Sequence, residues 1–355
     1  MLKARLIPVI VARGNLVVQS FYFQNYLPIG DVKTAIEFFV QWDVDEIIIL
    51  DITATKENRK PNFSLIEWAA SDCFVPLTIG GGIRDITDIR DLLNAGADKV
   101  CINNQAIHSP DFIKESSSVF GSQCITVSVD SKLIDDEYYV YSYIDKSYKS
   151  PTREFVKEVE NMGAGEIFLN SVDKDGSRAG YDIDLLKQVS SSLRIPVIAC
   201  GGAGHVDHLP KAINEGGCQA VAAANLFQHT EHSTIAAKSR LARENVPIRL
   251  SSDVKYEDFN FDIKSFSQEL NNAIKNIFIK EPINIILEPG RSIVAKSGII
   301  ESEVILVSKK NKHDKKRWVF LDIGRFGGLA ETESEAIRYK IIPVNNNSKC
   351  SSVNI

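Results

Sequence analysis

The stretch "VPLTIGGGIRDITDIRDLLNAGADKVCINN" at residues 75–104 has a second version, "IPVIACGGAGHVDHLPKAINEGGCQAVAAAN", at residues 195–225. Each version holds a short apolar run, a glycine pair, a helix-like pattern and another apolar run, in that order. A shorter pair, "EIIILDITA" at 46–54 and "EIFLNSVDK" at 166–174, repeats at the same spacing of about 120 residues. That spacing is half of an eightfold α/β barrel, so the repeat predicts two matching half-barrels with matching sites.

Strand-length apolar runs recur along the first 225 residues, with helical patterns between them. Their hydrophobicity is continuous rather than alternating, which is typical of parallel strands covered on both faces. Eight such units in roughly 250 residues predict an α/β fold, a closed (βα)8 TIM barrel with a half-barrel internal repeat. The runs lie at residues 5–11, 46–50, 75–79, 99–103, 124–129, 166–170, 195–200 and 220–224. A tight turn is expected after the first of them, within "RLIPVIVARGNLVV" at 5–18.

The pattern changes after about residue 255. An amphipathic helix pattern at 262–278 is followed by strand patterns at 283–287, 297–310 and 317–324, the last two separated by a basic loop. We therefore expect two domains, a barrel at residues 1–255 and a partial β-rich segment at 256–355.

Overall charge excludes several classes of partner. With 41 basic and 46 acidic residues, the net charge of −5 favours neither a nucleic acid nor a membrane surface. The apolar run near the N-terminus ends at Arg13 and is too short for a signal peptide, and no run is long enough to span a membrane. We expect a cytoplasmic protein. Its cysteines lack CxxC spacing and are predicted to be buried thiols rather than metal ligands; they are Cys73, Cys101, Cys124, Cys200, Cys218 and Cys350.

Two glycine-rich strand ends are candidates for binding anions, because glycine lets backbone amides approach a ligand before a helix begins. In a barrel these loops meet at the C-terminal face, where the active site lies. Two loops related by the repeat point to a substrate with a phosphate at each end. The predicted phosphate-binding residues are Gly81, Gly82, Gly201 and Gly202, with Asn103, Asn104, Ala224 and Asn225 one unit further on.

Carboxylates at strand ends are the natural acid–base groups. Asp51 and Asp130 each end an apolar run, so both are predicted to face the mouth of one pocket. Asp173 and Asp175 follow another strand in "SVDKDGSRAGYD" at 171–182. A single loop aspartate is more often solvated than catalytic, and the pairing of Asp51 with Asp130 carries the prediction.

Residues 1–253 resemble the cyclase subunit of imidazole glycerol phosphate synthase. The resemblance lies in "RLIPVIVARG", "IGGGIRD", "AGADKVCIN", "LNSVDKDGSRAGYD", "ACGGAG" and "VPIRL". That barrel takes ammonia from a glutaminase partner and uses it to cleave and cyclise a doubly phosphorylated ribulosyl intermediate of histidine biosynthesis. The resemblance implies phosphate sites at the glycine loops, further substrate contacts from Ser171, Asp175 and Gly176, and a catalytic role for Asp130, with Asp51 orienting the substrate.

The resemblance also implies an ammonia gate at the N-terminal face, where the glutaminase subunit would bind. Arg5, Glu46, Lys99 and Glu166 occupy the positions of a ring of alternating charges. A structural salt-bridge cluster is the alternative interpretation. Paired charges would let neutral ammonia pass while excluding water and cations.

The chain departs from the family at its first strand. The family's other catalytic aspartate falls at Val11, and a lysine eight residues later is Gln19. Losing one of two cooperating acid–base groups costs on the order of 10²–10⁴ in rate. Three interpretations stay open: a cyclase subunit of the ordinary type, an ammonia-delivering barrel for amidation of a surface-polysaccharide sugar, and a non-catalytic partner of a glutaminase.

Residues 258–343 resemble part of the pyridoxal-phosphate decarboxylases that act on ornithine, lysine or diaminopimelate. The stretch "IILEPGRSIVAKSGIIESEVILVSKK" carries the resemblance and matches Glu288, Gly290 and Arg291 to positions near that cofactor. The segment that holds the family's Schiff-base lysine has no counterpart here, so the cofactor would lack its covalent anchor. We expect a vestigial motif, no cofactor and no separate activity. A pyridoxal enzyme is the competing possibility.

Overall fold

A computed structural model describes residues 3–228, 233–251, 254, 304–308 and 318–321. The chain divides into two units, Met1–Asp258 and Phe259–Ile355, and each is described by itself.

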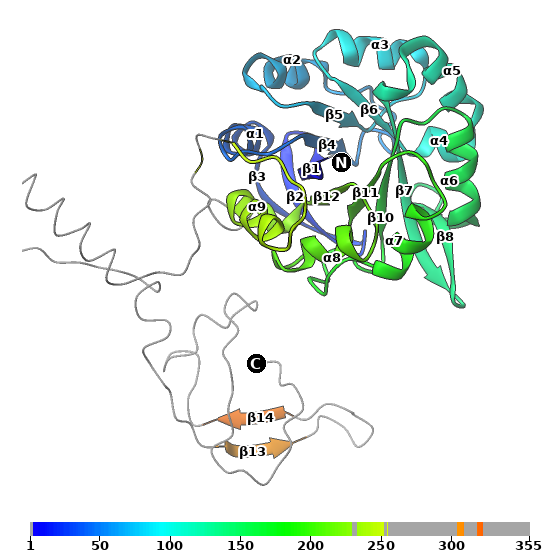
Figure 1. The fold of residues 1–355 in the computed structure, drawn as a ribbon. Coiled ribbons are helices and arrows are strands. Elements are labelled where there is room, and N and C mark those ends of the chain that lie inside the picture. Colours follow the sequence, from blue (N-terminus) through cyan, green and yellow to red (C-terminus); the bar gives the residue numbers. More distant parts are fainter. Residues whose placement is uncertain (1–2, 229–232, 252–253, 255–303, 309–317, 322–355) are drawn as a thin grey trace, which may run out of the picture. The chain divides into compact units, whose positions relative to one another are not determined.

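The first unit is a closed barrel of parallel strands (Figure 1). Each strand pairs in parallel with the next, and the ring closes where β12 pairs with β1, with Arg5 opposite Ala220. The ring comprises β1 (Arg5–Arg13), β4 (Ile47–Asp51), β5 (Leu77–Gly80), β6 (Lys99–Ile102), β7 (Ile125–Ile134), β10 (Glu166–Ser171), β11 (Val197–Cys200) and β12 (Ala220–Ala223). The predicted (βα)8 barrel is confirmed, and each of its eight predicted strands overlaps an observed one.

Helices surround the ring (Figure 1) and bury one apolar face each against it. In α3, for example, the Asp85 side chain caps the helix by accepting a hydrogen bond from the backbone amide of Asp88 at 2.9 Å. Ile89 and Leu92 of the same helix are buried. The helices are α1 (Val32–Gln41), α2 (Phe63–Asp72), α3 (Ile86–Asn94), α4 (Asn104–His108), α5 (Asp111–Phe120), α6 (Thr152–Asn161), α7 (Ile183–Ser190), α8 (His208–Asn214) and α9 (Ser233–Arg243), with 3-10 turns η1 (Ser122–Cys124) and η2 (Asn225–Gln228).

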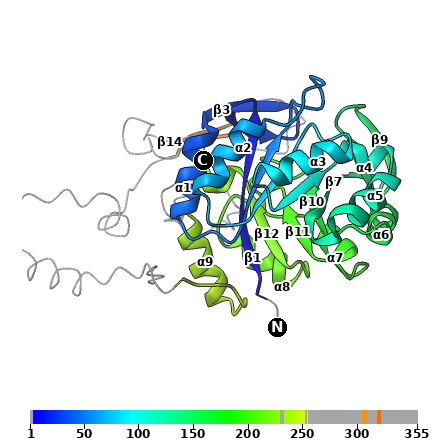
Figure 2. The ribbon, with the colours of Figure 1, turned by 90° about the horizontal axis from the view of Figure 1, so that it is seen from above.

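Two antiparallel hairpins extend from the ring at the C-terminal ends of its strands. β1 continues through a turn at Gly14, whose φ of 63° suits glycine, into β2 (Leu16–Phe21) and β3 (Asn25–Asp31). β7 continues likewise into β8 (Glu137–Ser142) and β9 (Ser147–Pro151). In Figure 2 the N-terminus and β3 lie at opposite ends of the barrel. The predicted turn after the first strand is present, and it begins a hairpin.

Apolar side chains fill the inside of the ring as well as the layer under the helices. The inner cluster is made of Ile7, Val9, Ile48, Cys101, Phe168, Ile198, Ala220 and Ala222, all buried. Such an interior is apolar and closely packed rather than water-filled. Its ends, where polar side chains replace apolar ones, are therefore the places for chemistry.

The last helix of the barrel is tied to its first strands. Ala4 forms a parallel bridge with Ile248, and its amide donates to the carbonyl of Pro247 at 2.6 Å. The fully buried Lys238 of α9 pairs with Asp43 at 3.2 Å and Asp45 at 3.1 Å. Because a buried charge is tolerated only when it is paired, this cluster fixes how α9 packs.

The described part of the second unit is one antiparallel pair, β13 (Val304–Ser308) and β14 (Trp318–Leu321), with Val307 opposite Val319. Both strands fall within the strand patterns predicted at 297–310 and 317–324. The predicted elements at 262–278 and 283–287, and the motif residues Glu288, Gly290 and Arg291, lie outside the described residues. Within the described ranges, no helix is both long and apolar enough to cross a membrane.

Candidate active site

The two glycine pairs adopt the same backbone conformation in both halves of the barrel. Gly81 and Gly201 have φ of 105° and 90°, and Gly82 and Gly202 have φ of 78° and 95°. A Cβ atom on Gly81 would overlap the carbonyl oxygen of Asp51, and one on Gly201 would lie 2.7 Å from the carbonyl oxygen of Ser171. Only glycine fits here, so the strand ends stay free of side chains at the two places where the repeat predicts a phosphate.

The residues one unit further along have different partners. Asn103 donates to the Asp130 carboxylate at 3.1 Å and to the Ser128 carbonyl at 3.0 Å, whereas Asn225 donates to the Ser20 carbonyl at 3.1 Å. The buried Oδ1 atom of Asn104 has no hydrogen-bond partner among the described residues. Ala224 packs against the inner apolar cluster. Asn103 thus orients the predicted catalytic carboxylate.

Asp130 lies on the inward-facing side of β7 and is 8% exposed. Burial, with a smaller contribution from the charge of Asp175, raises the pKa of Asp130 from 3.8 to about 7, while hydrogen bonds from Asn103 and Asn170 lower it. A carboxyl group that titrates near neutral pH can both accept and return a proton there. Asp130 therefore has the properties of an acid–base group.

This raised pKa predicts how stability depends on pH. Because the folded-state pKa lies above the unfolded-state value, wild-type stability falls as the pH rises from about 4 to about 7. Asp130→Asn removes this ionisation. The variant is expected to exceed the wild type in unfolding free energy by on the order of 4 kcal/mol at pH 8, with the difference vanishing near pH 4. Urea denaturation at the two pH values measures it, and an equal difference at both would contradict the assignment.

Asp175 anchors the β2–β3 hairpin over the loop that follows β10. Its Oδ2 atom accepts from the Ser20 hydroxyl at 2.6 Å and from the Phe23 amide at 3.2 Å. Burial raises the pKa of Asp175. Gly176, with φ of 69°, comes so close to Ser20 that a Cβ atom would lie 2.6 Å from the Ser20 carbonyl oxygen. These contacts hold the hairpin closed beside the mouth, a role that the sequence pattern did not reveal.

Phe23 continues this closure across to the second hairpin. Its ring packs edge-on against Tyr143, in the β8–β9 turn, with 6.2 Å between ring centroids. The two hairpins thus meet across the C-terminal end of the barrel. The aromatic run "FYFQNY" at 21–26 was the available signal for this contact.

Asp51 is held by its own loop. Its Oδ1 atom accepts from the amide and hydroxyl of Thr53 at 3.0 and 2.9 Å and from the amide of Ala54 at 3.2 Å. Arg59 binds the Oδ2 atom at 3.0 Å. With this many donors Asp51 shapes the loop after β4, and Arg59, which sequence reasoning missed, neutralises it.

The Ser171 hydroxyl is engaged at the start of α7. It donates to Asp182 at 3.3 Å, and Asp182 also accepts from the amide of Leu185 at the start of α7 and from the Tyr138 hydroxyl. Asp173 similarly accepts from the amide of Leu133 at 2.8 Å. The side chains of Ser171 and Asp173 are thus engaged in structural contacts.

Val11 faces the mouth of the barrel on the inward side of β1. It lies opposite Leu50, and like Leu50, Cys200 and Ala224 it packs against the inner cluster. Gln19 is buried within β2. The mouth is therefore divided, with apolar side chains on β1, β4, β11 and β12 and polar side chains on β6, β7 and β10.

The structure brings the four predicted gate residues together at the opposite end. Arg5 contacts Glu46 at 2.7 Å and Glu166 at 2.6 Å, and Lys99 contacts the same two glutamates at 3.0 and 2.8 Å. Thr78 adds a 2.6 Å hydrogen bond to Glu46, which is 1% exposed. The result is a closed ring of alternating charge. A pocket of about 170 Å³ adjoins it and is lined in part by Lys3, Pro76 and Arg249.

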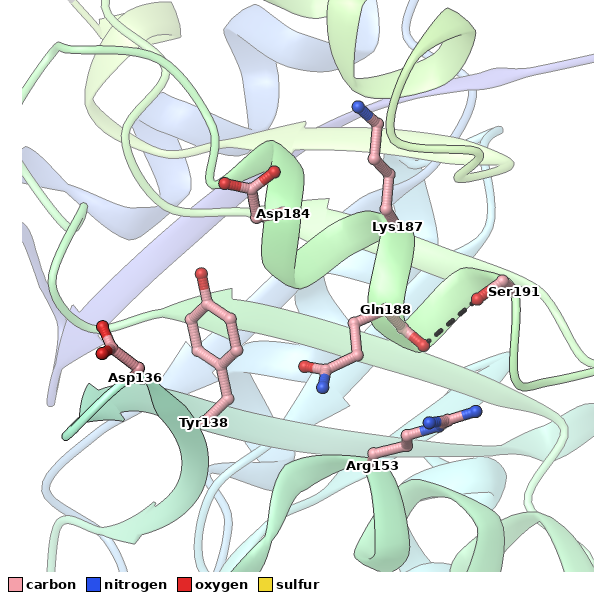
Figure 3. A pocket seen from close by; sticks show the side chains of 7 residues that line it. All are labelled: Asp136, Tyr138, Arg153, Asp184, Lys187, Gln188 and Ser191. Carbon is pink, nitrogen blue, oxygen red and sulfur yellow. Dashed lines mark hydrogen bonds between the residues drawn. The ribbon is translucent and has the colours of Figure 1, made fainter.

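A second, more open pocket of about 510 Å³ lies on the outer wall of the barrel (Figure 3). It is bordered by β8, α6 and α7 and is lined by Asp136, Tyr138, Arg153, Asp184, Lys187, Gln188 and Ser191. None of the predicted site residues lines it.

Metal ligation finds no support in the part of the chain that the structure describes. Those residues contain no group of three or more histidine, cysteine, aspartate or glutamate side chains that could hold a metal ion. The five cysteines in this part are free thiols, and burial raises the pKa of Cys101, Cys200 and Cys218.

Comparison with known proteins agrees with the barrel and its motifs. The family model described as "Histidine biosynthesis protein" matches residues 5–233. A protein of Vibrio vulnificus (strain YJ016), provisionally named imidazole glycerol phosphate synthase subunit hisF2, is 61% identical over 263 residues, which cover 74% of this chain and 97% of that relative. The chain belongs to the histidine-biosynthesis barrel family, as a member of its HisF-type cyclase branch.

Proposed function

We propose that the barrel receives ammonia at its N-terminal end from a glutaminase subunit and uses it, at its C-terminal end, in a cyclase-type reaction on a doubly phosphorylated substrate. The observation that carries this proposal is the closed charge ring of Arg5, Glu46, Lys99 and Glu166 beneath an apolar barrel interior. The relative's name, which describes a synthase subunit, supports the existence of a partner.

The ring and the interior would act together as a filter. Each ring charge already has two partners of opposite sign, so an entering cation gains little and loses its hydration. Neutral ammonia loses far less on entering an apolar space than ammonium does. The buried side chains above the ring then keep ammonia unprotonated on its way to the mouth.

At the mouth, the chain supplies two anion sites and one acid–base group. The bare glycine pairs at 81–82 and 201–202 would take the two phosphates. Asp130, oriented by Asn103 and titrating near pH 7, would accept and return protons as the nitrogen attacks and the ring closes.

Val11 is expected to limit the rate of this reaction. A single carboxylate has to do the proton transfer that the family divides between two, so we propose a cyclase subunit of low intrinsic rate. Delivery of ammonia to a polysaccharide sugar and a silent barrel that only activates a glutaminase are the competing outcomes of the test below.

Nitrogen tracing tests the proposal. The full chain, mixed with a glutaminase subunit and the doubly phosphorylated ribulosyl intermediate, is supplied with glutamine carrying ¹⁵N in its amide. We expect the label in the imidazole product even when unlabelled ammonium chloride is in excess in the solution. Label found only in free ammonium, with glutaminase activity stimulated by the barrel, would establish the silent partner instead. In a parallel mixture that holds an acetamido sugar in place of the ribulosyl intermediate, label in an acetamidino sugar would establish the polysaccharide acceptor.

A further inference from the structure

Strand β7 differs from the other ring strands along its inward face. Ile125, Val127 and Val129 lie in the core under the helices, so the alternate residues Thr126, Ser128 and Asp130 face the barrel interior. These three residues are polar at every level from the charge ring to the mouth. Every other ring strand contributes at least one apolar or glycine position to that path, such as Ile48, Gly80, Cys101 or Phe168. We call the three residues the β7 track.

Thr126 begins the track next to the charge ring. It is fully buried, and it lies opposite Glu166 of the ring on one side and Cys101 on the other. Its hydroxyl has no hydrogen-bond partner among the described residues. The contrast is Thr78, an equally buried threonine on β5, two strands away, whose hydroxyl is satisfied by Glu46 at 2.6 Å.

Asn170 stands at the other end of the track, opposite Asp130. Its side chain contributes to lowering the pKa of Asp130, and its buried Oδ1 atom has no partner among the described residues. Leaving a buried acceptor unsatisfied costs about 1–3 kcal/mol. The unsatisfied Thr126 and Asn170 oxygens therefore lie at the two ends of the β7 track. The track is about 13 Å long, because it spans four residues of a β-strand.

We propose that the Thr126 hydroxyl and the Asn170 Oδ1 atom are two binding stations for neutral ammonia, and that ammonia moves between them along the β7 track rather than along the apolar strands. The inference rests on the proposed function and adds its route. Ammonia has N–H donors for both oxygens and a lone pair for the threonine hydroxyl. Ammonia bound at Asn170 would lie beside Asp130, the proposed proton acceptor and donor. Thr126 is a positioning residue for this transfer.

Thr126→Val tests the first station, since valine keeps the shape and removes the hydroxyl. In the full complex, two rates of ¹⁵N incorporation are compared, one with nitrogen from labelled glutamine and one with labelled ammonium chloride in solution. We expect Thr126→Val to lower the product formed per glutamate released by about 2- to 12-fold, the worth of one neutral hydrogen bond. The rate with ammonium chloride at saturation should not change. Thr126→Ser should restore the ratio.

Ser116→Ala is the matched control. The Ser116 hydroxyl is also buried without a partner among the described residues, but it lies on α5, outside the ring. Its removal should leave the ratio of product to glutamate unchanged. An unchanged ratio in Thr126→Val, with the wild-type complex transferring label, would overturn the β7 track alone. Absence of label in the wild-type product would instead overturn the proposed function and the track with it.

Discussion

Asp130→Asn is expected to lower ammonia-dependent product formation by about 10²–10⁴, because it removes a carboxylate on the polar side of the mouth whose pKa lies at about 7. Asparagine can still accept the 3.1 Å hydrogen bond from Asn103, so the surrounding geometry should persist. The rate of labelled product formation in the complex, at saturating ammonium chloride, measures the effect without involving the gate.

The pH profile separates a chemical role of Asp130 from a structural one. If the ionised carboxylate accepts the proton, the wild-type rate should rise as the pH increases through about 7, the pKa of Asp130, and the variant should lack this inflection. Asp173→Asn is the control, since the contact observed for the Asp173 side chain is with the backbone amide of Leu133, in the part of β7 that extends into the hairpin. Unimpaired product formation in Asp130→Asn would leave the barrel without its assigned acid–base group.

Val11→Asp is expected to raise cyclisation of the doubly phosphorylated intermediate by about 10²–10⁴. Valine and aspartate are nearly equal in size, and Val11 is half-buried on the inward face of β1, so the new carboxylate would enter the mouth without repacking the core. It would stand on the apolar side, with Asp130 on the polar side, and restore two cooperating groups.

Val11→Asn separates proton transfer from polarity. It has the same shape as the aspartate variant but cannot take up a proton, and its rate should stay at the wild-type level. A rate in Val11→Asp no higher than in Val11→Asn would mean that the scaffold is not a cyclase lacking one group. An acceptor other than the ribulosyl intermediate, such as an acetamido sugar, would then be the better assignment.

The sequence predicted the ring and its glycine turns well for a physical reason. Doubly covered parallel strands need continuous apolar runs, and Gly81 and Gly201 occupy backbone positions that exclude any side chain. Both signals are local. The hairpins were harder to predict, because β3 is exposed along most of its length and carries no buried alternation.

The site was less predictable than the fold because its contacts join distant residues. The hydrophobic pattern around Asp51 does not predict its ion pair with Arg59. The pattern around Ser171 does not predict the hydrogen bond from its hydroxyl to Asp182. The gate residues were grouped only through the family resemblance, since Arg5 and Glu166 are separated by 161 positions.

The bridge between Ala4 and Ile248, together with the buried Lys238, sets the point at which the ring becomes complete during synthesis. Domains emerge and fold from the N-terminus as the ribosome elongates the chain. Here the nascent polypeptide contains every strand and tie of the barrel once Ile248 has been translated. The barrel can therefore assemble on the ribosome before residues 256–355 exist to compete for its apolar surfaces.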